Sequence, residues 1–355
     1  MPGTQLHGFP TPAFEVNIDG ATLSADTVGH LVRLSVDDSV DLPSMFALEF
    51  INSDTARGAL IQDQAQFDVG RVVEIKMGYD EQLTTLLVGE ITGLEPVYTA
   101  DRLPSLTVRG YDRRHRLQRG RKIRTFAKRK DSEIAAQIAQ EAGLSSRTTD
   151  SKVVHEYVLQ ANQTDMEFLL DRAQRIQYEV TVYDKQLRFQ PVANTGSAIL
   201  TLTLEEELIE FYPRLSSIGQ VSEVSVQGWD PKKKAAIVGK APQSAVTSTM
   251  GGAKSGAALV AQAFAAAIGR VSDSPMVTQA EADQVATALL NTTSLALITG
   301  TGMCTGHPEL RAGIVITLAG LGTRFSGQYY VVAASHRYTA AEGYVSHFTV
   351  RRNAS

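Results

Sequence analysis

The chain has 355 residues and a mass of 38.4 kDa, with 43% hydrophobic residues, 20% charged residues, 34 basic side chains and 38 acidic ones. This is the composition of an ordinary soluble globular protein with two or three domains. The net charge of −4 excludes a generic polyanion binder, and the single cysteine excludes an internal disulfide or a cysteine-built metal site. The first residues lack a basic stretch followed by an apolar one, so we expect no signal peptide. No run approaches the roughly 20 apolar residues of a membrane helix.

The first 110 residues predict β-structure. Apolar residues alternate over 14–18, 32–36, 46–50 and 73–77, which is the period of a strand with one buried face. Asp19-Gly20 supplies the left-handed residues of a tight hairpin turn. Many short strands separated by turns favour a closed barrel or a sandwich.

From about residue 111 the period becomes helical. Asp131 is expected to cap a helix that ends at Gly143, and Thr164 to Glu167 form a capping box for a second helix. A hairpin is expected over residues 178–189, turning at Asp184-Lys185. Residues 111–198 therefore predict a small α+β domain between β-rich segments.

Strand patterns return after residue 199 and continue to the end of the chain. Residues 231–256 are rich in Lys, Gly, Ser and Ala and are expected to be loosely ordered. An Ala-rich helix is expected over Gly256–Gly269, and a capping box from Thr278 to Glu281 opens another helix. We therefore expect an insertion of loop and helix at about 231–292.

Two parts of the β-rich sequence resemble each other. Gly70–Ile75 is similar to Gly313–Leu318, and Tyr98-Thr99-Ala100 recurs at 338–340. Leu106–Arg109 is similar to Phe348–Arg351. The spacing of 29 residues between the glycine that follows each first stretch and the threonine of the last one is the same in both copies. We interpret this as a diverged duplication of one β-barrel unit, with chance agreement as the alternative.

Several motifs with catalytic associations do not meet the requirements of their chemistry. Gly251–Ser255 lacks the glycines of a phosphate loop, and Gly300–Gly306 lacks the spacing of a dinucleotide site. Cys304 and His307 lie in a turn without a third group to orient them. The histidines have no metal-ligand spacing, and Glu205–Glu207 is a run of solvated carboxylates. We therefore expect no enzyme, no metal and no cofactor.

The charge is concentrated in one segment, residues 109–130. It holds eleven basic side chains against Asp112 alone, a local charge of +10 that leaves −14 for the rest of the chain. Such a segment either contacts phosphates or pairs with carboxylates within the chain or across a subunit boundary, and we favour the second interpretation. The candidate inter-subunit or partner-contact residues are Arg113, Arg114, Arg116, Arg119, Arg121, Lys122, Arg124, Lys128, Arg129 and Lys130.

The order of these segments resembles the late control D and VgrG family of baseplate hubs, found in contractile phage tails, type VI secretion and extracellular contractile injection systems. The likeness covers nearly the whole chain and is weakest from 231 to 292. The blocks that carry it are Gly110–Leu117, Gln160–Leu170, Gly320–Val331, His336–Tyr338 and Phe348–Arg352.

The resemblance implies a mainly β fold with two related tube-type β-barrels, at 1–110 and 199–355, around an α+β domain at 111–198. It also implies a homotrimer whose six barrels join a six-fold inner tube to a three-fold spike, alongside other baseplate proteins. Because longer members continue past the position of Ser355, the spike is expected to be a separate chain. The expected location is a phage tail baseplate or injection particle assembled in the bacterial cytoplasm, with no membrane insertion. Nucleic acid or effector cargo would pass through the channel only.

The function we expect is therefore a structural, non-enzymatic baseplate hub. Two alternatives stay open: a nucleic-acid-binding module that uses segment 109–130, and a carbohydrate-active β-protein, for which no credible carboxylate pair is present. The sequence does not distinguish a phage from a pyocin-like particle or a secretion system.

Overall fold

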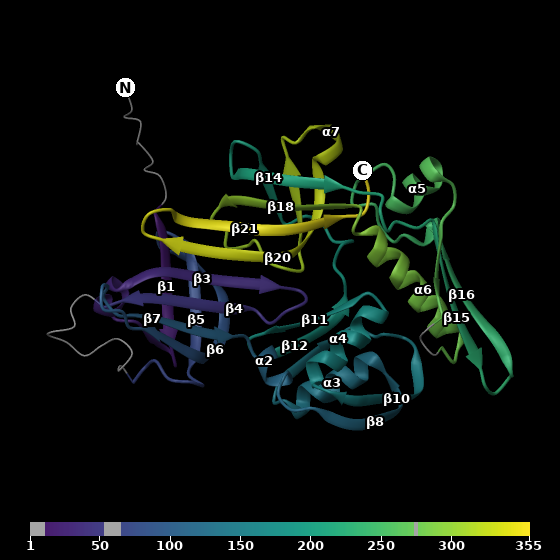
Figure 1. Cartoon of the computed structure of the whole chain (residues 1–355), viewed down its shortest axis with the longest axis horizontal. Coiled ribbons are helices and arrows are strands. Elements are labelled where there is room, and N and C mark those ends of the chain that lie inside the picture. The colour runs from purple at the N-terminus through teal and green to yellow at the C-terminus, as the bar shows by residue number, and fades with distance from the viewer. Residues whose placement is uncertain (1–10, 53–64, 273–275) are drawn as a thin grey trace.

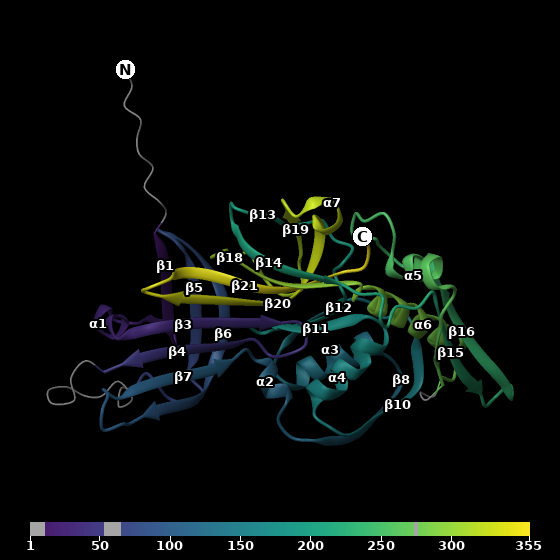
Figure 2. The same cartoon turned by 45° about the horizontal axis from the view of Figure 1, so that its top comes forward.

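The computed structural model describes residues 11–52, 65–272 and 276–355. The segment considered above for a signal peptide begins outside these residues. Two β-rich units lie along one long sheet, an α+β region packs below it in Figure 1, and an inserted subdomain projects at one end. Figure 2 gives the same arrangement after a rotation of 45°. The chain is mainly β, as its alternating apolar residues predicted.

The N-terminal unit is built on strands whose buried faces form one apolar core, centred on Leu34, Phe46, Phe50, Ile75 and Val108. Its elements are β1 (Pro12–Ile18), β2 (Ala21–Thr22), α1 (Ala25–Gly29), β3 (Leu31–Ser39), β4 (Met45–Ile51), β5 (Val72–Tyr79), β6 (Gln82–Val97) and β7 (Ser105–Tyr111). The turn between β1 and β2 uses Asp19 and Gly20 at positive φ, as the sequence predicted.

The α+β region follows and has its own core, in which Ile134, Ile138, Leu169 and Phe189 are buried. Its elements are α2 (Arg114–Leu117), β8 (Lys122–Lys130), α3 (Asp131–Glu141), β9 (Ser145–Thr148), β10 (Val154–Gln163), α4 (Asp165–Arg175), β11 (Tyr178–Tyr183) and β12 (Gln186–Pro191). β8 pairs with β10, and β11, β12 and β9 form a second small sheet.

The C-terminal unit completes the long sheet around a core that includes Leu202, Ile316, Tyr329 and Phe348. Its elements are β13 (Leu200–Thr203), β14 (Leu208–Leu215), β18 (Ile298–Thr305), β19 (Val315–Ala319), α7 (Gly322–Phe325), β20 (Gly327–Thr339) and β21 (Gly343–Arg352).

The inserted subdomain lies between β14 and β18. Its elements are β15 (Glu223–Asp230), β16 (Ala235–Pro242), a 3-10 turn (Gln243–Ala245), α5 (Gly256–Phe264), β17 (Ile268–Val271) and α6 (Gln279–Ser294). α6 packs on the sheet at Gly239, where an added Cβ would lie 2.3 Å from the backbone of Ala282. The subdomain therefore has a core of its own between its sheet and α6.

Two expectations for this insertion were wrong. Residues 231–256 are not all loosely ordered, because β16 pairs with β15 over eight residues and is covered by α6. The Ala-rich helix ends at Phe264 instead of Gly269, since the chain turns at Ala265 with φ of +66° and enters β17. Alanine content predicted the helix but not its end.

The helix caps were predicted in part. Thr164 and Glu167 form the expected capping box of α4. Asp131 does not cap α3, because Lys130 holds the N-cap position. Thr278 caps α6, but the Glu281 carboxylate accepts from the Val277 N–H and turns toward other partners. The Asp131 carboxylate contacts Arg172 instead, and the Glu281 carboxylate contacts Arg175.

The two units connect their strands in the same order. Along the sheet the N-terminal unit runs β3-β4-β7-β6-β5-β1, and the C-terminal unit runs β14-β18-β21-β20-β19-β13. Leaving out the two-residue β2, numbering the six remaining strands of each unit in chain order gives 2-3-6-5-4-1 in both cases. One difference is the direction of the last strand, since β1 is antiparallel to β5 whereas β13 is parallel to β19.

A glycine turn recurs in the two units. Gly70 and Gly313 have φ of 92° and 84°, a region that favours glycine. The Gly70 N–H donates to the Ile91 carbonyl of β6, and the Gly313 N–H donates to the Val331 carbonyl of β20. These two glycines begin the stretches whose sequences resemble each other.

The irregularities of the strands also recur. The register of β6 against β7 shifts by one residue at Thr92, and that of β20 against β21 shifts at Val332. The register of β3 against β4 shifts at Val32, and that of β14 against β18 shifts at Ile209. Because a β-bulge is a local and specific feature, these matching positions are strong evidence of equivalent strands.

The registers refine one correspondence drawn from the sequence. Ile91 pairs with Gly110, and the equivalent Val331 pairs with Val350, so Gly110 corresponds to Val350. The sequence match of Leu106–Arg109 with Phe348–Arg351 is therefore two residues out of register. A slip of two keeps every side chain on the same face, which is why the pattern did not reveal it.

The expected closure of each unit into a β-barrel is not confirmed. Within the described residues, β3 pairs with β4 on one side and with β20 of the C-terminal unit on the other, over Arg33–Ser39. The edge that would have closed the N-terminal barrel is therefore used to join the two units, and both belong to one open sheet.

Candidate functional site: the basic segment and its surroundings

The basic segment forms α2 and β8, at the boundary between the N-terminal unit and the α+β region. Among its ten candidate residues, seven form ion pairs within the chain. The carboxylates come from distant parts of the sequence, so only the folded chain brings them together.

One group of contacts surrounds the buried carboxylate of Glu90 in β6. Arg113 Nε lies 3.3 Å from it, Arg116 Nη2 lies 2.5 Å from it, and His115 Nε2 lies 2.9 Å from it. Burial alone would raise the pKa of Glu90, but the hydrogen bonds from Arg116 and His115 outweigh this effect and lower it. Arg113 also pairs with Asp184, which joins the N-terminal unit to the hairpin of the α+β region.

Arg114 is the most deeply buried cation of the segment, with 1% of its surface exposed. Its Nε donates to Asp112 over 2.8 Å, its Nη1 to the Ser39 carbonyl over 3.0 Å, and its Nη2 to Ser44 Oγ over 2.9 Å. These contacts tie the ends of β3, β4 and β7 together. Arg114 is therefore part of the interior of the protein.

The cations of β8 pair mainly with the α+β region. Arg121 contacts Glu167 over 2.9 Å, Lys122 contacts Asp165 over 2.6 Å, and Arg124 contacts Asp165 over 2.8 Å. Arg124 also pairs with Glu141. At the end of the strand, Lys130 contacts Asp150 over 2.9 Å.

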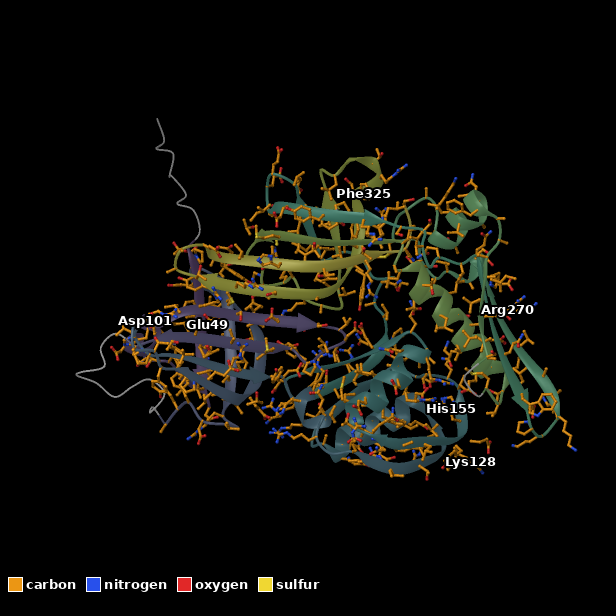
Figure 3. All side chains as sticks on the ribbon, viewed as in Figure 1. Glu49, Asp101, Lys128, His155, Arg270 and Phe325 are labelled. Atoms are coloured by element: carbon orange, nitrogen blue, oxygen red, sulfur yellow. The ribbon has the colours of Figure 1, made fainter. Side chains whose placement is uncertain are left out.

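Three candidates remain at the surface. Arg119, Lys128 and Arg129 are exposed and form no ion pair with the described residues, although Arg119 lies 3.5 Å from His115 Nδ1. Figure 3 places Lys128 at the outer edge of the α+β region. Seven of the ten candidates therefore pair with carboxylates of the same chain, and contact with a partner stays a prediction for the other three.

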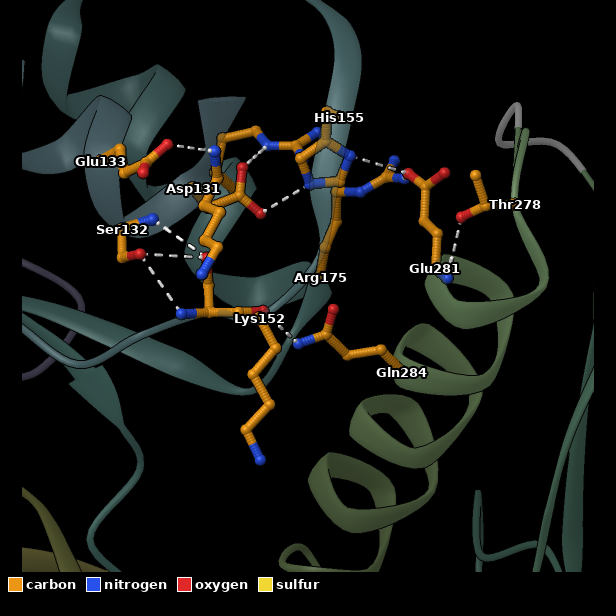
Figure 4. Close-up of polar contacts among 12 residues, drawn as sticks. Asp131, Ser132, Glu133, Lys152, His155, Arg175, Thr278, Glu281 and Gln284 are labelled. Atoms are coloured by element: carbon orange, nitrogen blue, oxygen red, sulfur yellow. Dashed lines mark hydrogen bonds and ion pairs between the residues drawn. The ribbon is translucent and has the colours of Figure 1, made fainter. Parts of the chain in front are cut away.

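A second charge network, which the sequence did not indicate, links the α+β region to α6 (Figure 4). His155 Nε2 lies 3.2 Å from Asp131, and His155 Nδ1 lies 3.6 Å from Glu281. Arg172 contacts Asp131 over 2.6 Å and Arg175 contacts Glu281 over 3.0 Å. Burial raises the pKa of Asp131, but its hydrogen bond to His155 and the charge of Arg172 outweigh this and lower it. Each carboxylate is balanced by cations, so the network holds two parts of the fold together.

Two hollows lie where the units meet. One, of about 740 Å³, is on the open face of the long sheet and is lined by residues that include Asp37, Tyr212, Ser335 and His347. The other, of about 390 Å³, lies beside the α+β region and is lined in part by Arg114, Glu179, Arg188 and Arg311.

One wall of the smaller hollow holds a buried acid. Burial raises the pKa of Glu179, and its carboxylate accepts a hydrogen bond from the Tyr330 hydroxyl. This contact joins β11 to β20, so it also ties the α+β region to the long sheet.

The motifs examined in the sequence occupy structural positions. Ser255 caps α5, and Lys254 of the same loop donates to Gln262 over 2.7 Å. Cys304 is fully buried in β18, where burial raises the pKa of its thiol to about 12, and burial lowers the pKa of His307. Glu207 accepts from the Thr203 N–H at the β13–β14 turn.

The described residues hold no group of three or more His, Cys, Asp or Glu side chains placed to bind a metal ion. Over the same parts of the chain, every helix falls short of the length and apolar character needed to cross a bilayer.

Solved structures with this fold come from phage tails and secretion systems. A 43 kDa tail protein of prophage MuSo2 from Shewanella oneidensis has a TM-score of 0.72 at 12% identity, covering 96% of this chain and 98% of its own. A tail protein from Neisseria meningitidis MC58 has a TM-score of 0.69 at 14% identity, covering 96% and 97%. The likeness shows that the chain has the fold of these tail proteins.

A third structure is an Escherichia coli protein described as a component of the type VI secretion system with structural similarity to T4 tail proteins gp27 and gp5. It has a TM-score of 0.61 at 13% identity, covering 96% of this chain and 77% of its own. These folds agree with the broad resemblance to hub proteins drawn from the sequence. No curated protein sequence matches the chain. The sequence model of the family described as the Alg8 N-terminal domain matches residues 10–340, and the chain belongs to that family.

Proposed function

We propose that this protein is a structural, non-enzymatic baseplate hub of a contractile tail or injection system. In this role three chains form a ring that joins the six-fold inner tube to a three-fold spike. The observation that carries the proposal is the repeated order of six strands in the two units, on a fold shared with phage tail proteins. The proposed role is that of a late control D or VgrG-like hub, in an assembly that also contains other baseplate proteins.

The repeat supplies a physical reason for the adaptor role. Three chains with two equivalent units each present six similar surfaces to a six-fold tube, whereas their other parts repeat only three times. We take the units as residues 1–110 and 199–355, with an α+β domain at 111–198 and an insertion at about 231–292. The α+β region lies below the long sheet and the inserted subdomain lies at its right-hand end in Figure 1, which is compatible with separate partners for separate parts of the chain.

The basic segment supports a scaffolding role better than nucleic-acid binding. Affinity for nucleic acid grows with the number of phosphates that cations neutralise. Most cations of the segment are already paired with carboxylates, and Arg114 is buried. Arg119, Lys128 and Arg129 are the candidates left for a neighbouring subunit or baseplate protein.

The experiment is to express the chain alone and together with the tube and spike proteins encoded beside it. Light scattering on the purified species is expected to give a mass of three chains, and the spike and tube proteins are expected to co-purify with it. A species of one chain that binds neither protein would contradict the proposal. The expected location is the tail baseplate of a virion or an injection particle, and antibody labelling of purified particles would test it.

A further inference from the structure

We infer that the outer face of the inserted subdomain binds an acidic protein of the same particle, with Trp229 entering a pocket of that protein. The face is formed by β15, β16 and β17 on the side opposite α6, and the turn between β15 and β16 extends it. We call it the hairpin face. The inference rests on the proposed function, because the partner is sought among the other proteins of the tail or injection particle.

Strand alternation divides the side chains of this small sheet between two faces. Val224 and Val226 of β15 and Ile237 of β16 belong to the core under α6. Gly269 of β17 also lies on the inner side, since an added Cβ there would contact Val224. The pairing registers then place the following side chains on the hairpin face: Glu223, Ser225, Gln227, Trp229, Ala236, Val238, Lys240, Ile268 and Arg270.

Apolar side chains of the hairpin face are exposed to solvent. Trp229, the single tryptophan of the sequence, is 55% exposed, and Ile268 is 48% exposed. Val238 is opposite Gln227 and therefore lies diagonally beside Trp229 on the same face. Figures 1 and 2 both show β15 and β16 projecting from the end of the molecule, and Figure 3 places Arg270 at this end. A partner can therefore reach the face without displacing the α+β region.

The hairpin face is also strongly basic. Lys240 and Arg270 are exposed on the two sides of β15, and neither forms an ion pair with the described residues. Three further lysines, 232–234, form the turn at the tip. Against these five cations stand Glu223 and Asp230, in a chain whose net charge is −4. Positive charge is therefore concentrated here although the chain as a whole is acidic.

Asp230 holds the tip of the hairpin in one conformation. Its carboxylate accepts hydrogen bonds from the backbone N–H groups of Lys232 and Lys233, over 2.9 and 3.0 Å. Lys233 Nζ lies 3.7 Å from the same carboxylate, but its side chain is 82% exposed, so this ion pair is weak. Lys232 and Lys234 form no ion pair with the described residues. Because the turn is already formed, less entropy is lost when a partner binds these lysines.

The partner that fits the hairpin face carries carboxylates around an apolar pocket. Opposite charges across an interface steer association, and like charges exclude the wrong partner. Tryptophan and arginine are the residues that most often dominate binding energy in protein interfaces. Trp229 beside Val238 forms the apolar centre, and the cations surround it. A second copy would present the same positive charge, so two hairpin faces repel each other.

Nucleic acid fits the hairpin face less well than an acidic protein does. Proteins that bind single strands stack successive bases on several aromatic side chains, whereas Trp229 is the one aromatic residue among the outward side chains of these strands. Val238 and Ile268 have no favourable contact to make with a phosphate. A protein partner would remove both of them from water.

Footprinting and cross-linking of purified particles test the inference. Hydroxyl radicals oxidise exposed indole rings, and mass spectrometry measures the oxidation of Trp229 in the purified protein and in the particle. We expect oxidation to fall several-fold in the particle, because the partner covers the ring. A carbodiimide joins lysine amines to carboxylates in contact with them. We expect it to link Lys232 or Lys234 to an acidic residue of another protein, which the cross-linked peptides identify.

Variants then test the contact with the protein so identified. Trp229→Ala is expected to weaken its binding by about 30-fold, the loss typical of a central tryptophan. Lys232→Gln with Lys234→Gln is expected to weaken it and to reduce its dependence on salt. The matched control is Arg147→Gln with Lys185→Gln, which removes two exposed cations of the α+β region that have no ion pair with the described residues. We expect the control to bind as the parent protein does.

The outcomes separate this inference from the proposed function. If particles contain the chain but Trp229 is as reactive there as in the purified protein, the inference is overturned and the hub proposal stands. Protection already present in the purified trimer would assign the face to a second copy, and protection that nuclease removes would assign it to nucleic acid. Either result overturns the inference. If purified particles lack the chain, the hub proposal fails and this inference fails with it.

Discussion

The N-terminal and C-terminal units have the same strand order, yet equivalent strands differ in burial. Leu34 in β3 is fully buried in the N-terminal core and has β20 beside its strand, whereas its counterpart Phe211 in β14 is half-buried at the edge of the sheet. The position in the fold is the same, and the difference is that β3 has β20 on its other side, whereas β14 pairs only with β18 among the described strands. In the ring that we propose, this open edge would be a candidate surface for a neighbouring subunit.

A second difference lies at the ends of the units. The N-terminal unit ends in the buried Arg114–Asp112 pair, whereas the C-terminal unit ends in Arg352, which donates to the Ser326 carbonyl over 2.9 Å. A third lies in β20, where His336 is buried at the position that Pro96 holds in β6. Equivalent positions of the two units therefore hold different polar groups.

The largest expected effect comes from the buried ion pair. Arg114→Ala would leave the Asp112 carboxylate buried without its cation and is expected to lower the free energy of unfolding by about 4 kcal/mol. Arg352→Ala, which removes one hydrogen bond to the Ser326 carbonyl, is expected to lower it by about 2 kcal/mol. Urea denaturation of both variants measures the difference. Equal losses in the free energy of unfolding would show that the contacts at the ends of the two units are of similar strength.

The next effect compares the interior strand with the edge strand. Leu34→Ala is expected to lower the free energy of unfolding of the isolated chain by about 3 kcal/mol through the lost burial and the cavity left behind. Phe211→Ala, at the equivalent edge position, is expected to have a smaller effect in the isolated chain and a larger one in the trimer. Denaturation at low and high protein concentration provides the measurement. A Phe211→Ala effect that is independent of concentration would argue against an edge covered by another subunit.

The third effect is a loss of stability at acidic pH. Burial lowers the pKa of His336 to about 4, while its Nε2 donates to the Leu310 carbonyl and its Nδ1 accepts from Tyr344 and Ser346. At pH values between the ordinary pKa of histidine, about 6.5, and the pKa in the folded chain, the unfolded chain binds a proton at this position more readily than the folded chain does. The free energy of unfolding therefore falls as the pH falls. At about pH 5 the loss in free energy of unfolding is about 2 kcal/mol.

Denaturation at about pH 7 and pH 5 checks this expectation against His336→Gln, in which the titrating group is absent. The variant is expected to lose about 2 kcal/mol less than the parent protein between the two pH values. The same slope in both proteins would mean that His336 does not titrate in this range.

The smallest effect tests the equivalence of the glycine turns. Gly70→Ala and Gly313→Ala place a side chain at positive φ, which costs about 1–2 kcal/mol. Because both turns donate to the same position of the equivalent strand, we expect the two losses to agree within about 0.5 kcal/mol. Denaturation of the two variants measures them, and a marked asymmetry would weaken the equivalence of the units.

Local patterns predicted much of the fold. Alternating residues such as Val73, Ile75 and Met77 are buried as expected, since the strand period is a property of the chain itself. The repeat of Gly70–Ile75 at Gly313–Leu318 could also be recognised in the sequence, because a turn at positive φ favours glycine and both copies therefore have this residue at the turn. Closure of each unit into a barrel is not confirmed by the described residues, and the pairing of β3 with β20 could not be predicted, because it joins residues about 300 positions apart and has no local signal.

The charged site was predicted less well. The basic segment was evident, but its partners Glu90, Glu141, Asp165 and Asp184 lie at separate places in the sequence, and only the packing of the α+β region brings them to it. The density of positive charge predicted that carboxylates would lie near the segment, but it did not identify which carboxylates these would be. The network around His155 was missed for the same reason.

The central claim is that both units of each chain occupy equivalent places in one closed ring. Electron microscopy of the purified hub, viewed along the ring axis, tests this most directly. The account predicts a three-fold particle in which six similar β-rich units surround the axis at nearly equal spacing, with units from the two halves of the chain in alternation. A particle with only three units around the axis, with the other halves displaced from the ring, would contradict it.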